Sequence, residues 1–318
     1  MAELKPKVSI IGCGNVGIRY AYSLMISGLA RSIVLVDRNL KRAEGEAMDL
    51  SHGAPYTAPV EITAGDYADI KNSDLVVITA GKKQLPGQTR VDLVKDNIEA
   101  FKSLIPEIVK NAPKALLLIV SNPVDILAYA ARKISGKPAN EVIGSGTVLD
   151  SARLRYLIAK HCRLDPHNVH AYVLGEHGDT EFPVWSKSMI GGMPLDQYCP
   201  FCMRSKTCDH GRELNNLFTE VRDSAYRIIE KKGETSYGIG LALTRITRAI
   251  LRDENAVLPV SSLINDYFGV NDVYLSMPAI VNRAGVRELL RLDLNEVEQK
   301  AMKHSADTLK AIIAQSGL

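Results

Sequence analysis

The stretch VSIIGCGNVG, residues 8–17, decides the fold of this chain. The short apolar run 8–11 leads directly into Gly12-Cys13-Gly14-Asn15-Val16-Gly17, and a segment with helical periodicity follows. A second apolar run then ends at Asp37, twenty residues after Gly17. A strand, a G-x-G-x-x-G loop, a helix and a second strand with an acidic end form the unit that binds dinucleotides. The sequence therefore predicts a dinucleotide site near the amino terminus.

Each residue of this pattern has a physical role. Gly12 permits the tight turn, Gly14 lets the backbone approach a pyrophosphate, and Gly17 lets the helix pack closely on the strand. Asp37 can accept hydrogen bonds from a ribose 2′-hydroxyl and would repel a 2′-phosphate, which favours NAD over NADP, although two arginines follow closely. The alternative is a glycine-rich turn in a protein that binds no nucleotide.

Short β-branched runs recur through the first half of the chain, with helix-period segments between them. Runs without polar alternation are typical of strands that are buried on both faces, and the helical spacers supply crossovers. We expect a Rossmann-type, doubly wound parallel α/β sheet over residues 1–145. The predicted strands are Val8–Ile11, Ile33–Val36, Val60–Ile62, Leu75–Thr79, Ala115–Val120 and Val142–Ile143.

The second half has closely spaced turn signals, which predict hairpins in a mixed α+β substrate domain over residues 146–318. Gly191-Gly192 and Asn282–Gly285 are the turns. An Asn295-x-x-Glu298 cap predicts a terminal amphipathic helix. The expected strands are Val169–Leu174, Pro183–Ile190, Ala256–Leu263 and Val273–Val281, and the apolar helix positions are Val297, Ala301, Leu309, Ile312 and Ile313.

Composition excludes several classes of function. The 318 residues carry a formal net charge of only +3, so the charge gives no indication that the chain binds nucleic acid or an anionic membrane. With 46% hydrophobic and 24% charged residues it matches a soluble globular protein. Five cysteines are too few for a disulfide framework, and neither a signal peptide nor a membrane-spanning run is evident. We therefore expect a cytoplasmic protein.

A histidine and a helix start provide candidate chemistry in the second half. His177 follows an apolar strand within Gly175-Glu176-His177-Gly178-Asp179, and a histidine can exchange a proton near neutral pH. Asp150 and Arg153 lie three residues apart, so a helix would place both on one face. The carboxylate could orient an imidazolium, and the guanidinium could bind a carboxylate in bidentate fashion. A structural histidine and a surface ion pair are the alternatives.

Two loops follow predicted strands at the edge where doubly wound sheets bind ligands. Residues 80–90 form a polar stretch with Gly and Pro that ends at Arg90, and we expect it to be a mobile lid. An ordinary solvent loop would explain its lysines equally well. After the next strand, Ser121-Asn122-Pro123-Val124-Asp125 brings the side-chain amide of Asn122 to the same edge.

Together these motifs resemble the L-lactate/malate dehydrogenase family, and the resemblance covers essentially the whole chain. The motifs occur in the order of the family and at suitable separations, which makes them highly specific jointly. They are Gly12–Gly17 with Asp37, Gln84–Arg90, Asn122–Asp125, Asp150 to Arg153, Gly175–Asp179, and Gly233-Glu234-Thr235-Ser236-Tyr237-Gly238.

The resemblance implies hydride transfer between NAD and a 2-oxo acid, with His177 as proton donor and Asp150 stabilising the imidazolium. Arg153 would bind the substrate carboxylate and Arg90 would polarise the carbonyl. The implied substrate-binding residues are Gln84, Arg90, Asn122, Asp125, Arg153 and Thr235. The implied cofactor-binding residues are Gly12, Gly14, Val16, Gly17, Asp37, Arg42, Tyr67, Gly81, Lys82, Val120 and Asn122.

The family separates its lactate and malate enzymes chiefly at the position of Gln84. A malate enzyme needs a cation there, because the second carboxylate of oxaloacetate would otherwise be buried unpaired. Neutral Gln84 therefore predicts pyruvate and L-lactate as substrates. The alternative is malate dehydrogenase, since a shift of the loop by one residue would bring Lys83 to this position.

Arg155 and His170 resemble residues of bacterial relatives that are activated by fructose 1,6-bisphosphate. An arginine and a histidine that meet across a subunit interface could hold a phosphate and couple its binding to subunit arrangement. The alternative is an exposed helix arginine and a packed strand histidine. The family also suggests a homotetramer.

A cysteine cluster lies outside the family chemistry. Cys199, Cys202, Cys208 and His210 could complete a structural zinc site, although the Cys-x-His spacing is unusually tight. Functionally silent surface thiols are the favoured alternative. A non-catalytic NAD-binding redox sensor is a further alternative. It is disfavoured because a protein that has lost its enzymatic activity need not keep His177 together with the carboxylate of Asp150.

Overall fold

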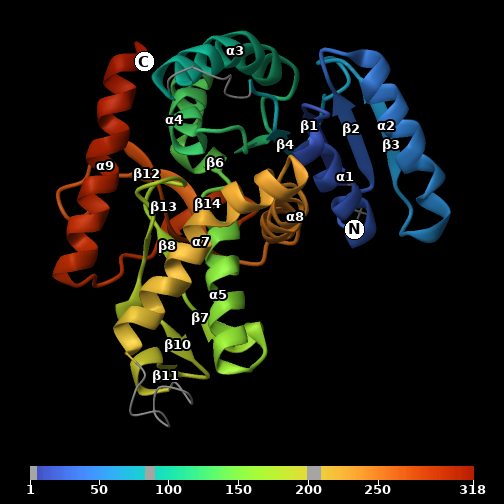
Figure 1. Cartoon of the computed structure of the whole chain (residues 1–318). Coiled ribbons are helices and arrows are strands. Elements are labelled where there is room, and N and C mark those ends of the chain that lie inside the picture. Colours follow the sequence, from blue (N-terminus) through green and yellow to red (C-terminus); the bar gives the residue numbers. More distant parts are fainter. Residues whose placement is uncertain (1–5, 83–89, 199–208) are drawn as a thin grey trace.

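The computed structural model describes residues 6–82, 90–198 and 209–318. Its first half is a parallel sheet in the order β3-β2-β1-β4-β5-β6 (Figure 1). Each strand overlaps the apolar run predicted for it, so the prediction of a doubly wound parallel sheet is confirmed. The strands are β1 (Lys7–Ile11), β2 (Ser32–Val36), β3 (Glu61–Gly65), β4 (Leu75–Ile78), β5 (Leu116–Ile119) and β6 (Val142–Gly144).

Helices cover both faces of this sheet. Neighbouring strand residues such as Ile10 and Ile11 point to opposite faces, and both are buried. Ile11 belongs to a core with helices α3 and α4, whereas Ile10 belongs to a core with α1, α2 and α8. Burial on both faces explains the absence of polar alternation. The helices are α1 (Asn15–Ser27), α2 (Leu40–His52), α3 (Arg90–Asn111), α4 (Val124–Ser135) and α8 (Tyr237–Leu251).

Three antiparallel strands of the second half extend the same sheet. They are β12 (Ala256–Ile264), β13 (Val273–Asn282) and β14 (Gly285–Leu289). Within the described part of the chain the sheet has nine strands, in the order β14-β13-β12-β6-β5-β4-β1-β2-β3. The junction between the halves is the pairing of Ser261 in β12 with Gly144 in β6. The predicted hairpin through Asn282–Gly285 is present, but no sequence pattern indicated that it would join the first sheet. The division at residue 145 stays a prediction.

The expected strand Val169–Leu174 is wrong as a single element. It divides into β7 (Val169–His170), in a small sheet with β10 (Met189–Ile190) and β11 (Met193–Pro194), and β8 (Val173–Leu174), which pairs with β9 (Phe182–Pro183). The division follows from the partner run, because the 3-10 helix Trp185–Lys187 separates β9 from β10. At the start of helix α5 (Val148–Cys162), the Thr147 hydroxyl donates to Val173 O, and Val173 N donates to Ser151 Oγ. The run predicted over 183–190 is likewise interrupted, by the same 3-10 helix.

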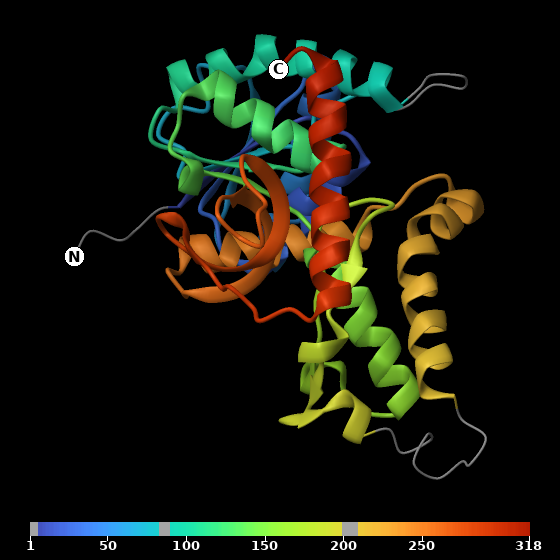
Figure 2. The ribbon, with the colours of Figure 1, turned by 90° about the vertical axis from the view of Figure 1, so that its left-hand side faces the viewer.

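Two long helices complete the second half, α7 (His210–Lys232) and α9 (Glu296–Ser316). Figure 2 shows α9 in red, with its carboxyl-terminal end beside α3. The predicted capping box of Asn295 and Glu298 is confirmed. Val297 is 75% exposed, so its predicted place on the apolar face is wrong. No helix in the described ranges is long and apolar enough to cross a membrane.

Candidate active site

The glycine loop lies at the carboxyl edge of the parallel sheet, beside the loops that follow β4 and β5. A Cβ on Gly12, which has φ +109°, would lie 2.6 Å from the backbone nitrogen of Ala80, and a Cβ on Gly17 would lie 2.0 Å from the carbonyl oxygen of Gly12. Both positions therefore require glycine because of close backbone packing. By contrast, a Cβ on Gly14 would meet nothing within 4 Å.

This open space at Gly14 fits a pyrophosphate group. Gly14 is the N-cap of α1 and has no side chain to cap the helix, so the first backbone N–H groups of α1 lack a side-chain partner. A helix amino terminus of this kind attracts and binds phosphate. The loop could therefore hold the pyrophosphate of a dinucleotide.

Asp37 ties the glycine loop to the end of β2. Its Oδ2 accepts from the backbone N–H of Cys13 at 2.7 Å, and its Oδ1 accepts from the backbone N–H of Asn39 at 2.9 Å. Each carboxylate oxygen keeps a second lone pair that could accept from a ribose hydroxyl. Asp37 thus has a structural role that the motif alone did not reveal.

A buried asparagine that sequence reasoning missed joins the other two loops. Asn97 of α3 accepts from the Lys82 N–H at 2.7 Å and donates to the Asn122 carbonyl at 3.1 Å. Asn97 is fully buried and lies on the apolar face of α3 with Val94 and Phe101. A polar residue at an apolar helical position was the signal that could have identified it.

The remaining predicted cofactor residues lie along the same edge. Val16 is half-buried in the first turn of α1, and Val120 is half-buried directly after β5. Tyr67, after β3, packs against the core that includes α3 and α4. Arg42 is exposed on α2, where its guanidinium lies 3.9 Å from the Glu46 carboxylate, and Gly81 is exposed after β4.

The start of α5 brings together the three residues predicted to carry the chemistry. Oδ2 of Asp150 lies 2.7 Å from Nδ1 of His177, and its Oδ1 accepts from the Arg153 guanidinium at 2.8 Å. The Asp150 side chain is only 3% exposed, whereas the His177 side chain is 27% exposed. A buried carboxylate thus orients an imidazole that a ligand can still reach.

Electrostatics favour the protonated imidazole. Burial opposes the charge on His177, but the charge of Asp150 and its hydrogen bond outweigh burial and raise the pKa of His177 to about 9. Burial likewise opposes ionisation of Asp150, but His177 and Arg153 hold the pKa of Asp150 below its usual range. The imidazole of His177 therefore favours its protonated form at neutral pH and could give a proton to a ligand.

Asp125 contacts the backbone of His177. Its Oδ2 accepts from the His177 N–H at 2.8 Å, and its Oδ1 accepts from the hydroxyl of Ser261 at 2.5 Å. Asp125 is 2% exposed. Its carboxylate is enclosed and bonded to the protein, and the expectation that it binds substrate stays a prediction. Asp125 fixes the position of His177 from helix α4.

Thr235 and Asn122 are the remaining predicted substrate residues whose side chains the structure describes. Thr235 is half-buried in the link between α7 and α8. The start of α8 lies against the start of α5, since a Cβ on Gly238 would come within 2.9 Å of Leu149 Cδ1. Asn122 is exposed at the end of β5. Both are therefore close in the chain to elements that carry the site.

Several predicted residues lie outside the described side chains. Gln84 falls in the undescribed segment 83–89, and the zinc candidates Cys199, Cys202 and Cys208 fall in 199–208. Arg90 and His210 begin α3 and α7. The lid and the zinc site stay hypotheses.

The two predicted allosteric residues lie on different elements, Arg155 on a face of α5 other than that of Arg153, and His170 on β7. Arg155 is half-buried and donates from Nε to the carbonyl of Ser151 at 3.2 Å. Burial, and to a smaller extent the charge of Arg245, lower the pKa of the Arg155 guanidinium, and they outweigh the opposing effect of Tyr172. His170 is exposed on β7. Among the described residues no hydrogen bond joins Arg155 to His170.

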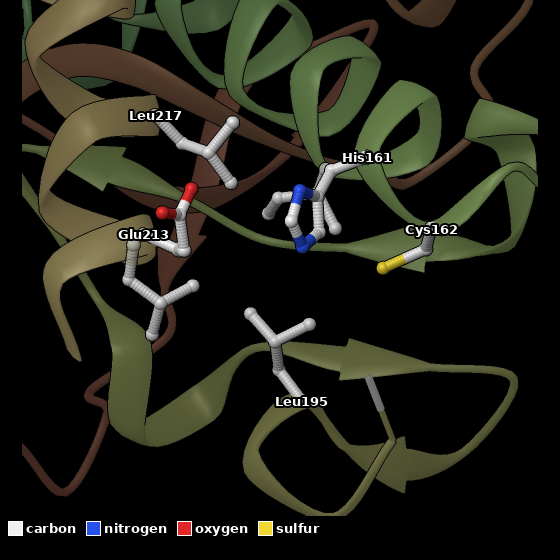
Figure 3. Close-up of a pocket in the computed structure, with 7 residues that line it drawn as sticks. His161, Cys162, Leu195, Glu213 and Leu217 are labelled. Carbon is white, nitrogen blue, oxygen red and sulfur yellow. The ribbon is translucent and has the colours of Figure 1, made fainter. Parts of the chain in front are cut away.

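A pocket at the other end of α5 is separate from the site (Figure 3). Its lining is mostly aliphatic, with the His161 ring turned inward. Asp150 and Cys162 are twelve residues apart on one helix, which corresponds to about 18 Å. The lining residues are Ile158, His161, Cys162, Leu195, Glu213, Leu214 and Leu217.

Two family models match this chain end to end. The lactate/malate dehydrogenase NAD-binding domain matches residues 6–144, and the lactate/malate dehydrogenase α/β C-terminal domain matches residues 147–317. The chain belongs to the lactate/malate dehydrogenase family. The resemblance read from the sequence and the predicted class, an NAD-dependent dehydrogenase, are thereby confirmed.

Similar proteins within this family include curated and solved examples. The L-lactate dehydrogenase of Thermoanaerobacter pseudethanolicus is 50% identical over 97% of this chain and 98% of its own length. That of Acetivibrio thermocellus is 51% identical over 96% of each chain. The crystal structure of a lactate dehydrogenase from a Medee basin deep-sea metagenome library superposes with a TM-score of 0.95 at 43% identity, covering 99% of this chain and 100% of that one.

Proposed function

We propose that this dehydrogenase is an L-lactate dehydrogenase that interconverts pyruvate and L-lactate. The observation that carries the proposal is the Asp150–His177 pair beside Arg153, a charge-assisted proton donor next to a guanidinium. The curated relatives, half identical over nearly the whole chain, are named L-lactate dehydrogenase and support the choice of substrate.

Each residue of the site has a separate role in the proposed reaction. NADH, when bound along the glycine loop and Asp37, supplies the hydride that reduces the keto group. His177 donates its proton to the carbonyl oxygen and recovers it in the reverse direction. Asp150 stabilises the imidazolium, and Asp125 holds the His177 backbone in place. The Arg153 guanidinium binds the substrate carboxylate.

The remaining roles follow the family pattern. Arg90 polarises the carbonyl when the loop before it closes, and closure excludes water. Asn122 donates to the substrate oxygen, and Thr235 shapes the pocket near the substrate side chain. Neutral Gln84 accommodates the methyl group of pyruvate.

Substrate preference tests this proposal directly. Pyruvate should be reduced far faster than oxaloacetate at equal concentration in an assay of NADH oxidation. Gln84→Arg should invert the preference, because the new cation would neutralise the second carboxylate of oxaloacetate. A wild-type preference for oxaloacetate would instead indicate malate dehydrogenase.

We further propose that fructose 1,6-bisphosphate activates a homotetramer through Arg155 and His170. The half-buried Arg155 guanidinium, with Arg245 near it, supports an anion site on this side of α5. The pyruvate saturation curve should shift to lower concentration when the bisphosphate is added. An unchanged curve rules this regulation out.

A further inference from the structure

Glu181 is a third ionisable group beside the Asp150–His177 pair. It follows His177 in the turn between β8 and β9, where its N–H donates to the carbonyl of Gly178 at 3.2 Å. This turn brings its side chain back to the imidazole. Glu181 is only 7% exposed. Within the described ranges no hydrogen bond joins its carboxyl group to another protein group.

The three side chains form one compact cluster. A carboxylate oxygen of Asp150, a ring nitrogen of His177 and a carboxylate oxygen of Glu181 all lie within 4.8 Å of one another. The other charges facing Glu181 are Arg153 on α5 and Arg222 on α7. At this separation and degree of burial, a change in the charge of one member changes the proton affinity of the others.

We propose that Glu181 is a positioning residue whose carboxyl group sets the proton affinity of His177. The inference rests on the proposed role of His177 as proton donor. Burial and the charge of Asp150 raise the pKa of Glu181 to about 8, so this carboxyl is mostly neutral at pH 7. As pH rises through 8 it ionises, and its charge joins that of Asp150 in stabilising the imidazolium. Glu181 thus keeps the donor protonated under alkaline conditions.

Glu181→Gln tests the proposal, because the amide has the shape of the neutral carboxyl and cannot ionise. Below about pH 7 the kcat/KM for pyruvate should match wild type. On the alkaline side its decline should begin at a pH lower by on the order of one unit. Asp179→Asn is the matched control. It removes a carboxylate two residues away that is exposed and accepts from the Tyr226 hydroxyl at 3.2 Å.

An NMR titration of the His177 ring gives a readout that does not depend on turnover. Its signal is assigned by its absence in His177→Asn. The His177 pKa should fall in Glu181→Gln and stay at the wild-type value in Asp179→Asn. If wild type failed to reduce pyruvate, the proposed function would be lost while this titration still tested the cluster.

Two results would overturn the proposal. One is an unchanged His177 titration and alkaline limb in folded Glu181→Gln. The other is a uniform loss of kcat/KM at every pH, which would indicate a purely structural role. Should the glutamine variant fail to fold, Glu181→Asp serves instead. It retains an ionisable group on a shorter side chain and should keep most of the alkaline activity.

Discussion

The glycine loop and His177 both belong to the proposed active site, yet they are held in different ways. The loop is fixed mainly by main-chain contacts, with the Gly12 N–H donating to the Val36 carbonyl at 2.7 Å, with glycines where a Cβ would collide with main chain, and with one added bond from the Cys13 N–H to Asp37. His177 is fixed by carboxylates from two helices, Asp150 on α5 and Asp125 on α4. The first region depends on shape and the second on charge.

The two regions should therefore respond differently to amino-acid substitution. A change at Gly12 or Gly17 alters main-chain packing and therefore stability together with cofactor binding. A change at His177 alters a proton and its partners while the fold around it remains. The following substitutions test that separation, in order of decreasing effect.

Replacing His177 with Asn should give the largest effect, a loss of kcat for pyruvate of about 10²–10⁴-fold. The binding of NADH should stay unchanged, since the glycine loop is untouched. Titration of NADH fluorescence and a steady-state assay measure the two quantities. Loss of both together would show that the two regions do not separate.

The pH dependence of wild-type activity tests the protonation of His177 directly. Because the pKa of His177 is raised to about 9, reduction of pyruvate, which needs the imidazolium, should persist up to that pH and then fall. Oxidation of lactate needs the neutral ring and should rise over the same interval. A decline of pyruvate reduction near pH 6.5 would contradict the stabilisation by Asp150.

Substitutions in the loop should act on stability. In Gly17→Ala the new Cβ would meet the Gly12 carbonyl oxygen at 2.0 Å, and we expect a loss of about 3 kcal/mol in the free energy of unfolding. Gly14→Ala is the matched control. Its Cβ points into open space, so the melting temperature of the free protein should hold while NADH binding weakens. Equal melting temperatures for both variants would refute the packing argument.

The smallest effect is expected from substitution of Ser261, whose hydroxyl donates a hydrogen bond to Asp125. Ser261→Ala removes the hydroxyl that donates to Asp125 and should cost about 1–2 kcal/mol of stability, with less than a tenfold change in kcat/KM. Ser262→Ala is the neighbouring control, because the Ser262 hydroxyl is buried without a hydrogen-bond partner in the described structure. Its removal should be neutral or stabilising in chemical denaturation. A larger loss from Ser262→Ala would reverse this assignment.

The same contrast explains how much the sequence could predict. The glycine loop and the parallel strands were predictable because local spacing and burial on both faces determine them. The helical face shared by Asp150 and Arg153 was predictable for the same reason. The role of Asp125 was not, since its partners Ser261 and His177 lie 136 and 52 residues away along the chain.

Two other features were not predictable for a related reason. The division of Val169–Leu174 depends on the 3-10 helix Trp185–Lys187 in its partner run, which no strand pattern indicates. The place of Glu181 beside His177 depends on a turn and on the docking of α5, which periodicity does not describe. Contacts that arise only when the chain turns and packs in three dimensions were the part that sequence patterns could not supply.

The nine-stranded sheet has a consequence for engineering by recombination. Strands β12 to β14 continue the parallel sheet beyond β6, so a fragment that stops near residue 145 would leave β6 as an open edge available to other chains. A chimera that exchanges the cofactor half between relatives therefore needs β12 from the same parent, or a matching Ser261–Gly144 junction. The whole sheet should therefore be exchanged together, although the order of the motifs along the chain suggests two separable modules.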